Sequence, residues 1–214
     1  MAEPATPSRW LPRRAWEGVL AGGHFGKADE TGVMVQTREA LGIATLIAGE
    51  DGHAALGAAM HERFGLTLPQ APIAVRSGGR QLVWTGPGQW LLIADSRKGF
   101  RDDLAKLAGL AAIADQSNGR AVLSLSGPHV RDLLAKGVML DLHPAAFLVG
   151  TAASTSIAYL GVTLWRSIDG PEGPVFEIMA ARSMAGSFWS WLSASAGEFG
   201  YAVTTGRASS ADRG

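Results

Sequence analysis

The pattern of apolar runs and turn residues in this chain occurs twice. A β-α-β-β-α order of expected elements covers about residues 43–110 and again about residues 121–196. In both copies the two neighbouring β runs meet at a Gly-Pro turn, over residues 86–88 in the first copy and 170–174 in the second. Glycine and proline at such a point predict a tight connection between strands. Two units without long crossovers predict an α+β fold, in which mostly antiparallel or mixed sheets carry helices on one face.

The first copy contains two apolar strand-like runs and two amphipathic stretches. Leu56, Met60 and Phe64 recur on one helical face, and Gly65 follows as a helix end. The predicted elements are a strand over 43–48, a helix over 51–64, a hairpin over 81–84 and 90–94, and a helix around 100–107.

The second copy repeats this order. Val130, Leu133 and Leu134 mark one face of its first helix, and Gly137 is placed to supply the positive φ of a helix end. The predicted elements are strands over 121–125, 156–159, 162–167 and 175–180, and a final helix that carries Met184, Phe188, Trp191 and Leu192 and stops at Gly197.

Three regions are predicted along the chain: an N-terminal arm over 1–35, a duplicated α+β domain over 36–203 with halves of about 36–113 and 114–203, and a disordered tail over 204–214. The arm contains Trp10 and Trp16 beside several arginines. Tryptophan and arginine are common anchors of protein interfaces. These tryptophans therefore either dock onto a partner or fold back onto their own domain, and the sequence leaves both alternatives open.

Composition excludes several classes of function. The 214 residues are 47% hydrophobic and carry 19 basic against 19 acidic side chains, which predicts a soluble globular protein. This balance of charge does not favour nucleic-acid binding, which normally needs clustered Lys and Arg. No cysteine is present, which removes disulfides, thiolate metal sites and cysteine nucleophiles and favours a cytoplasmic location. No apolar run is long enough to predict insertion into a membrane.

Common catalytic and metal-binding patterns are missing from the sequence. His53 and His61 share a predicted helix but lie two turns apart, roughly 12 Å by helical rise, too far for one ion. The glycines at 86 and 88 lie between two strands and do not form a nucleotide-binding loop. We therefore predict no catalytic residue and no metal ligand in this chain.

One polar segment, residues 115–120, is a candidate ligand site. Asp115, Ser117, Asn118 and Arg120 precede a predicted strand and could direct several donors and acceptors at one place. The alternative is a turn that the Asp and Ser side chains hold together. The sequence leaves both interpretations open.

Several of these segments, taken in order, resemble a known family. The segments are residues 86–93, residues 115–127 with the apolar positions that follow them, and residues 176–179 leading to 188–192. This set resembles the aminomethyltransferase-like, folate-binding superfamily and, within it, the gamma subunit family of heterotetrameric sarcosine oxidase. The likeness spans about residues 32–201.

The resemblance implies a complex that oxidatively demethylates sarcosine to glycine, with tetrahydrofolate as the one-carbon acceptor. It implies alpha, beta and delta subunits as partners, FAD and FMN held by alpha and beta, NAD by alpha, and zinc by delta. The gamma subunit of that family supports assembly and has no established catalytic residue. No cofactor is therefore expected on this chain, and the four polar residues of 115–120 stay candidates only.

Other functions remain open at this stage. A free-standing folate protein of the same fold usually carries a K-G-C-Y-x-G-Q-E motif, which a chain without cysteine lacks. A genuine aminomethyltransferase is considerably longer and has a further C-terminal domain. A protein-interaction module, or the equivalent subunit of another N-methylamino-acid oxidase or dehydrogenase, is also consistent with these residues.

Overall fold

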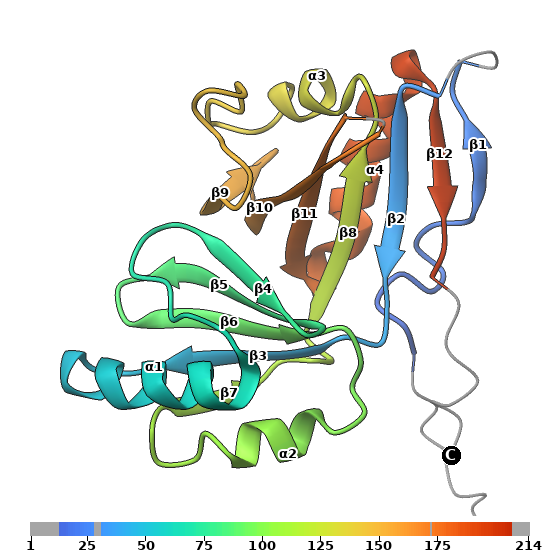
Figure 1. Ribbon diagram of the computed structural model, residues 1–214. Helices are drawn as coiled ribbons and strands as arrows, with labels where there is room; N and C mark the ends of the chain where they lie inside the picture. The colour runs from blue at the N-terminus through green and yellow to red at the C-terminus, as the bar shows by residue number, and fades with distance from the viewer. Residues whose placement is uncertain (1–12, 28–30, 172, 207–214) are drawn as a thin grey trace, which may run out of the picture.

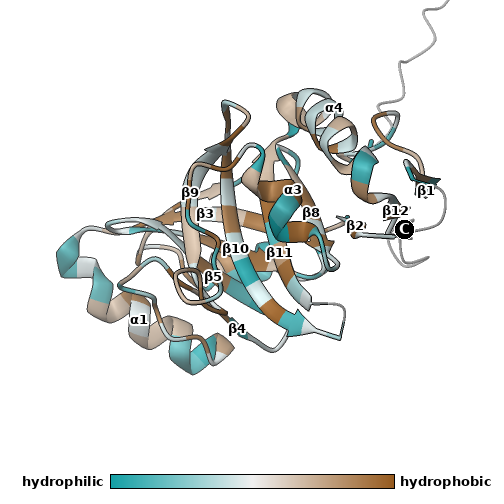
Figure 2. Ribbon diagram, turned by 90° about the horizontal axis from the view of Figure 1, so that it is seen from above, coloured by the Kyte–Doolittle hydropathy of each residue, from teal (hydrophilic) through white to brown (hydrophobic). Residues whose placement is uncertain are grey.

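The computed structural model describes residues 13–27, 31–171 and 173–206. Two β-sheets pack face to face, and helices cover the outer face of each sheet, which gives four layers (Figure 1). The strands of one sheet run across those of the other in this view. Figure 2 shows α1 and α4 on opposite sides of the molecule with the strands between them.

The first half forms a five-stranded sheet in the order β4-β5-β6-β3-β7. Neighbouring strands in it are all antiparallel. Its elements are β3 (Gly42–Ile47), α1 (Glu50–Phe64), β4 (Ala74–Ser77), β5 (Arg80–Gly86), β6 (Gln89–Ala94), α2 (Phe100–Ala105) and β7 (Ala112–Asp115). The predicted hairpin is confirmed, because β5 and β6 pair with Gly86 opposite Gln89.

The second half forms a seven-stranded sheet in the order β1-β12-β2-β8-β11-β10-β9. Its elements are β1 (Gly23–Phe25), β2 (Val33–Arg38), β8 (Arg120–Ser126), α3 (Val130–Ala135), β9 (Ala152–Ile157), β10 (Leu160–Gly170), β11 (Gly173–Ala181), α4 (Ala185–Ala196) and β12 (Tyr201–Thr204), with short 3-10 turns over Arg182–Met184 and Gly197–Phe199. The second Gly-Pro hairpin is also confirmed, since Gly170 of β10 pairs with Gly173 of β11.

Both halves repeat one β-α-β-β-β-α-β plan, with β3 to β7 corresponding to β8 to β12. The predicted α+β class with duplicated units is confirmed. The first unit has two strands more than the sequence indicated, β4 and β7, and the second has one more, β12. The copies differ at one position. In the first half β7, the last strand of the unit, pairs with β3, whereas in the second half β2 lies between β8 and β12.

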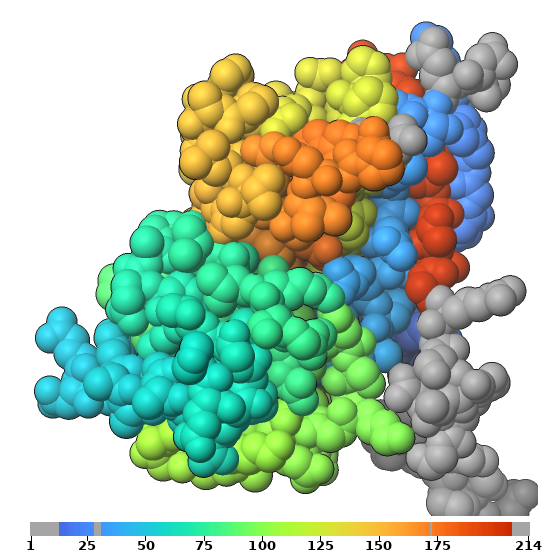
Figure 3. Space-filling view, in the orientation of Figure 1, coloured from blue at the N-terminus to red at the C-terminus, as the bar shows by residue number. Residues whose placement is uncertain are grey.

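Three buried hydrophobic clusters match the layers. One lies between the five-stranded sheet and the helices α1 and α2, and a second between the seven-stranded sheet and α3 and α4. The third joins the two sheets. Its buried members are Leu41, Ile43, Val83, Leu91, Ile93, Val122, Ala152, Trp165 and Met179. Figure 3 shows the two halves in contact along one boundary.

Part of the predicted N-terminal arm belongs to the folded domain. β1 and residues 33–35 of β2 lie within the stretch expected to be an arm, and both strands belong to the seven-stranded sheet. The reason is hydrogen bonding, since β2 pairs with β8 on one side and β12 on the other and satisfies backbone groups that would otherwise be unpaired. The first half therefore begins at β3, and residues from 23 to 38 belong with the second half.

Trp16 lies inside the chain's own core. Its side chain is 2% exposed, belongs to the cluster under α3 and α4, and donates a hydrogen bond from Nε1 to the Val122 carbonyl oxygen at 2.9 Å. A ring covered in this way is not an exposed docking anchor. Of the two alternatives, Trp16 therefore folds back onto its own domain. Trp10 lies outside the described residues, and its docking role stays a prediction.

Two glycines predicted as helix ends behave differently. Gly65 ends α1 with φ of 63°, the left-handed conformation that glycine adopts at low cost. Gly137 does not have a positive φ, and the last turn of α3 ends at Lys136 in right-handed geometry. A Cβ at Gly137 would lie 2.6 Å from the Trp191 ring, so close packing requires this glycine.

Replacing Trp16 should weaken the fold. Trp16→Ala removes a large buried ring and is expected to lower the free energy of unfolding by about 3–5 kcal/mol. Trp16→Phe keeps most of the packing and leaves the Val122 carbonyl without its donor, so a smaller loss of about 1–2 kcal/mol is expected. Urea unfolding of the three proteins measures both values. Equal stability of wild type and Trp16→Ala would contradict the buried position.

Candidate functional site: a cleft between the sheets

The segment from Asp115 to Arg120 is the crossing from the first sheet to the second, because β7 ends at Asp115 and β8 begins at Arg120. Ser117 links this segment to β3, because the Ser117 Oγ accepts a hydrogen bond from the Ile43 amide at 3.0 Å. The Ser117 amide and hydroxyl both donate to Oδ1 of Asp115, at 2.9 and 2.6 Å. These contacts describe a turn held by Asp and Ser side chains.

The Asp115 carboxylate is stabilised in its charged form. Burial raises its pKa, but the two hydrogen bonds from Ser117 and the positive charges of Arg101 and Arg97 outweigh that effect. The net result is a pKa below the usual value for Asp. Asp115 therefore carries its negative charge at neutral pH and is occupied by contacts within the turn.

Two arginines hold the crossing from either side. Arg97 donates to the Ser117 carbonyl and to Oδ1 of Asn118, both at 2.6 Å, and its Nε donates to the Leu41 carbonyl at 3.1 Å. Arg182 reaches the same segment through its amide, which donates to the Gly119 carbonyl at 2.9 Å. The four candidate residues are thus brought together as a structural crossing, and ligand binding by Asp115, Ser117, Asn118 and Arg120 stays a prediction.

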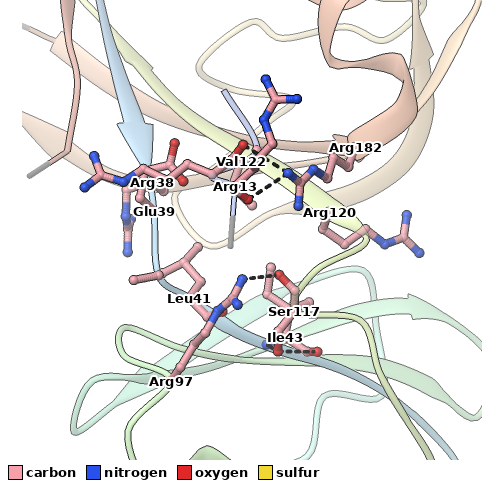
Figure 4. Close-up of a pocket in the computed structure, with 13 residues that line it drawn as sticks. Arg13, Arg38, Glu39, Leu41, Ile43, Arg97, Ser117, Arg120, Val122 and Arg182 are labelled. Carbon is pink, nitrogen blue, oxygen red and sulfur yellow. Dashed lines mark hydrogen bonds between the residues drawn. The ribbon is translucent and has the colours of Figure 1, made fainter. Parts of the chain in front are cut away.

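A cavity of about 500 Å³ lies beside this crossing, between the two sheets. Ser117, Arg120 and the apolar Leu41, Ile43 and Val122 form part of its wall, and Glu39 is its acidic member (Figure 4). Six arginines line it, Arg13, Arg14, Arg38, Arg97, Arg120 and Arg182. We call this cavity the arginine cleft. Of the sequence-predicted candidates, Ser117 and Arg120 line it, whereas Asp115 and Asn118 do not.

Arg120 itself is partly buried in the wall. Its Nε donates to Oε1 of Gln116 at 2.6 Å, and burial lowers the pKa of its guanidinium from the usual value. Arginine still remains charged at physiological pH under such a shift.

Arg38 joins the cleft to a buried acid. Its Nη1 donates to Oε1 of Glu177 at 2.7 Å, and its Nη2 donates to Oδ1 of Asp95 at 2.9 Å. Burial raises the pKa of Glu177, and this effect exceeds the opposing influence of Arg38. Oε2 of Glu177 has no hydrogen-bond partner in the described part of the chain. The pair thus fixes β2 to β11 at a position where Glu177 is costly to ionise.

The cleft residues outside 115–120 were not predicted from the sequence, because they are far apart along the chain. Arg97 follows β6 and Arg182 follows β11, which are corresponding strands of the two units. Both arginines donate to the crossing segment. The repeat was therefore a signal in the sequence that could have paired Arg97 with Arg182, because both follow corresponding strands. Arg38 could not be placed beside them without knowing that β2 belongs to the second sheet.

Within residues 13–27, 31–171 and 173–206, no group of three or more His, Asp or Glu side chains is placed to hold a metal ion. The histidines lie in other settings, for example His53, whose ring nitrogen contacts the Ala48 carbonyl oxygen. Nor does any helix in this part of the chain have the length and apolarity needed to cross a bilayer.

Comparison with known proteins identifies the family. Residues 48–198 match the model of the family described as "Sarcosine oxidase, gamma subunit family". The chain belongs to this family. The resemblance inferred from the sequence is thereby confirmed.

Individual relatives agree with this assignment. The gamma subunit of sarcosine oxidase from Arthrobacter sp. is 38% identical over 125 residues, which cover 56% of this chain and 60% of that relative. A chain of the heterotetrameric sarcosine oxidase from Corynebacterium sp. U-96, solved in complex with pyrrole 2-carboxylate, superposes with a TM-score of 0.68 at 32% identity. That superposition covers 81% of this chain and 88% of the other.

A more distant structure defines the fold. Aminomethyltransferase T of the glycine cleavage system from Bartonella henselae superposes with a TM-score of 0.60 at 13% identity, over 82% of this chain and 48% of that one. The predicted aminomethyltransferase-like fold is therefore confirmed.

Glu177 should make stability depend on pH. Because burial raises its pKa, the folded chain binds this proton more tightly than the unfolded chain does. The stabilisation is complete below the ordinary Glu value of 4.5 and is lost as pH rises through the higher folded value. Glu177→Gln cannot ionise, so the stability of wild type relative to this variant should fall as pH increases above about 4.5. Urea unfolding between pH 4 and 8 measures the difference, and parallel curves would contradict it.

Proposed function

We propose that this chain is a non-catalytic assembly subunit of a heterotetrameric sarcosine oxidase. In this proposal the complex oxidatively demethylates sarcosine to glycine with tetrahydrofolate as the one-carbon acceptor, in the cytoplasm. Its partners are the alpha, beta and delta subunits, which carry FAD, FMN, NAD and zinc. The family match and the likeness to a chain of the U-96 complex support this assignment.

The observation that carries the assembly role is an exposed apolar surface. Ten large hydrophobic side chains are exposed among the described residues, and six of them fall between residues 139 and 168. The six are Met139, Leu140, Leu148, Val149, Tyr159 and Ile168. They lie on the loop from α3 to β9, on the β9–β10 turn and on β10. Figure 3 shows this part, yellow to orange, open at the surface.

Backbone contacts tie these segments together. Val138 forms a bridge with Ile157, which brings the start of the loop beside the β9–β10 turn. The amide of Gly150 donates to the Arg166 carbonyl at 2.8 Å, so the end of the loop lies beside β10. The contacts define two groups, with Met139, Leu140 and Tyr159 near one end of β10 and Leu148, Val149 and Ile168 near the other. We call the six side chains together the apolar face. Grouped exposed apolar residues are typical of protein interfaces.

Tyr159 is the most exposed member of the apolar face. Its side chain is 98% exposed at the tip of the two-residue turn that joins β9 and β10. Ala158 and Tyr159 both have positive φ, 47° and 68°, a conformation usually left to Gly, Asn or Asp in such turns. An exposed aromatic ring held on a strained turn gains nothing for the isolated fold, and tyrosine is a frequent hot spot of interfaces. Both facts support a docking role for this turn.

The assignment to the complex is tested by copurification. A tagged form of this chain, captured from its native cells, should bring down three further proteins, flavin absorbance between 350 and 500 nm, and sarcosine-dependent oxidase activity. Mass spectrometry identifies the proteins, and an untagged strain serves as control. Recovery of a colourless, solitary chain would contradict the proposal.

The docking role of Tyr159 has a matched control in the same turn. Tyr159→Gly removes the ring and relieves the positive φ, so we expect it to weaken assembly by at least about 2 kcal/mol without lowering the stability of the isolated chain. Ala158→Gly relieves the same kind of strain but keeps the ring, so assembly should remain at the wild-type level.

Titration of each variant against the other coexpressed subunits measures assembly, and thermal unfolding measures stability. Equal loss of assembly in both variants would assign the effect to turn geometry rather than to the ring. Wild-type assembly in both would remove Tyr159 from the interface.

A further inference from the structure

The arginine cleft concentrates positive charge in a chain whose formal net charge is zero. Its wall contains six arginines and one acidic residue, Glu39. Figure 4 shows Arg97 on the side of the five-stranded sheet and Arg182 on the side of the other sheet, with their guanidinium groups toward the cavity. Such convergence of one charge sign in a recess focuses the field on whatever enters it.

Most of these guanidinium groups form no direct ion pair. Within the described residues, Arg38 is the only one of the six arginines whose guanidinium lies within 4 Å of a carboxylate oxygen, and it pairs with both Glu177 and Asp95. Arg97 and Arg182 are bound instead to neutral carbonyl and amide oxygens. Neutral partners hold a guanidinium in place without a direct ion pair. Asp115 offsets part of the charge of Arg97, and Glu39 offsets part of the charge of Arg14 and Arg182. The arginines of the wall still outnumber these acids.

Arg97 and Arg182 are also fixed in position with donors to spare. A guanidinium has five N–H groups, and Arg97 uses three of them, on Leu41, Ser117 and Asn118, which leaves two. Arg182 donates through Nη2 to the Arg13 and Arg14 carbonyls, at 2.7 and 3.2 Å. Because these side chains are ordered before any ligand binds, little conformational entropy is lost on binding.

We infer that the arginine cleft binds a small anion that carries carboxylate or phosphate groups. Paired guanidinium N–H donors match the oxygens of either group. The volume of about 500 Å³ lies in the range of small-molecule sites. Leu41, Ile43 and Val122 supply an apolar wall on which a short carbon skeleton can pack. This site is distinct from the apolar face and goes beyond the assembly role.

Glu39 opposes an anion in the cleft and offers a second test. Burial raises the pKa of Glu39, while Arg14, the backbone amides of Ala15 and Trp16, and Arg182 favour its charged form. In that form it competes with a ligand for these arginines. Removing its charge should therefore strengthen binding, whereas a purely structural cluster of arginines would show no such gain.

The test is isothermal titration of the full chain with two probes, inorganic pyrophosphate and citrate, at constant ionic strength set with sodium chloride. Saturable binding by one probe and not the other assigns the phosphate or the carboxylate class. Arg182→Gln should weaken the apparent Kd of the binding probe at least tenfold, and Glu39→Gln should strengthen it several-fold. Arg63→Gln is the matched control, since Arg63 is an exposed arginine of α1 that does not line the cleft.

Thermal unfolding of each variant separates loss of binding from loss of fold. If Arg182→Gln fails to fold, tighter binding of the probe by Glu39→Gln still tests whether the cleft is the binding site. Absence of saturable binding by both probes to the wild type would overturn the inference. The inference would also be overturned if Arg182→Gln and Glu39→Gln bound the probe with the same apparent Kd as Arg63→Gln.

Discussion

The packing of the two sheets against each other is the interaction on which the rest of this structure depends. Trp165, Met179 and Val122 of the seven-stranded sheet meet Ile43, Leu91 and Ile93 of the other. Since helices cover the outer faces, the central strands are buried on both sides, and β6 is buried from Trp90 through Ala94. This double burial explains the nearly continuous apolar runs in the sequence. It also makes Glu177, within the same interface, dependent on Arg38.

Sheet packing also creates the cleft. The chain passes between the sheets from β2 to β3 and again within residues 115–120, and the backbone of this second crossing has polar groups that need partners. Arg97 and Arg182, from equivalent connections of the two units, supply those partners. Duplication thereby places one arginine on each side of the crossing, and Arg38 and Arg120 add further positive charge. The positive cleft is a consequence of how the two units are joined.

Local signals predicted much of this fold. The apolar runs and Gly-Pro turns gave both hairpins, and Gly65 ends α1 as expected. β1, β2 and β12 were missed because they are stabilised by pairing with distant strands, which no local pattern records. For Gly137 the local signal was misleading, since contact with Trp191 and not backbone conformation requires glycine there. The 115–120 segment was located correctly, but five of the cleft arginines lie outside it and are assembled by tertiary structure.

The proposed docking of the apolar face onto other subunits is tested most directly by hydrogen–deuterium exchange. Exchange should be measured on the chain alone and within the purified complex. We expect slower exchange on assembly for the amides of residues 139–149 and 157–160, the segments that carry Met139, Leu140, Leu148, Val149 and Tyr159. Unchanged exchange in both segments, with protection elsewhere on the chain, would contradict it.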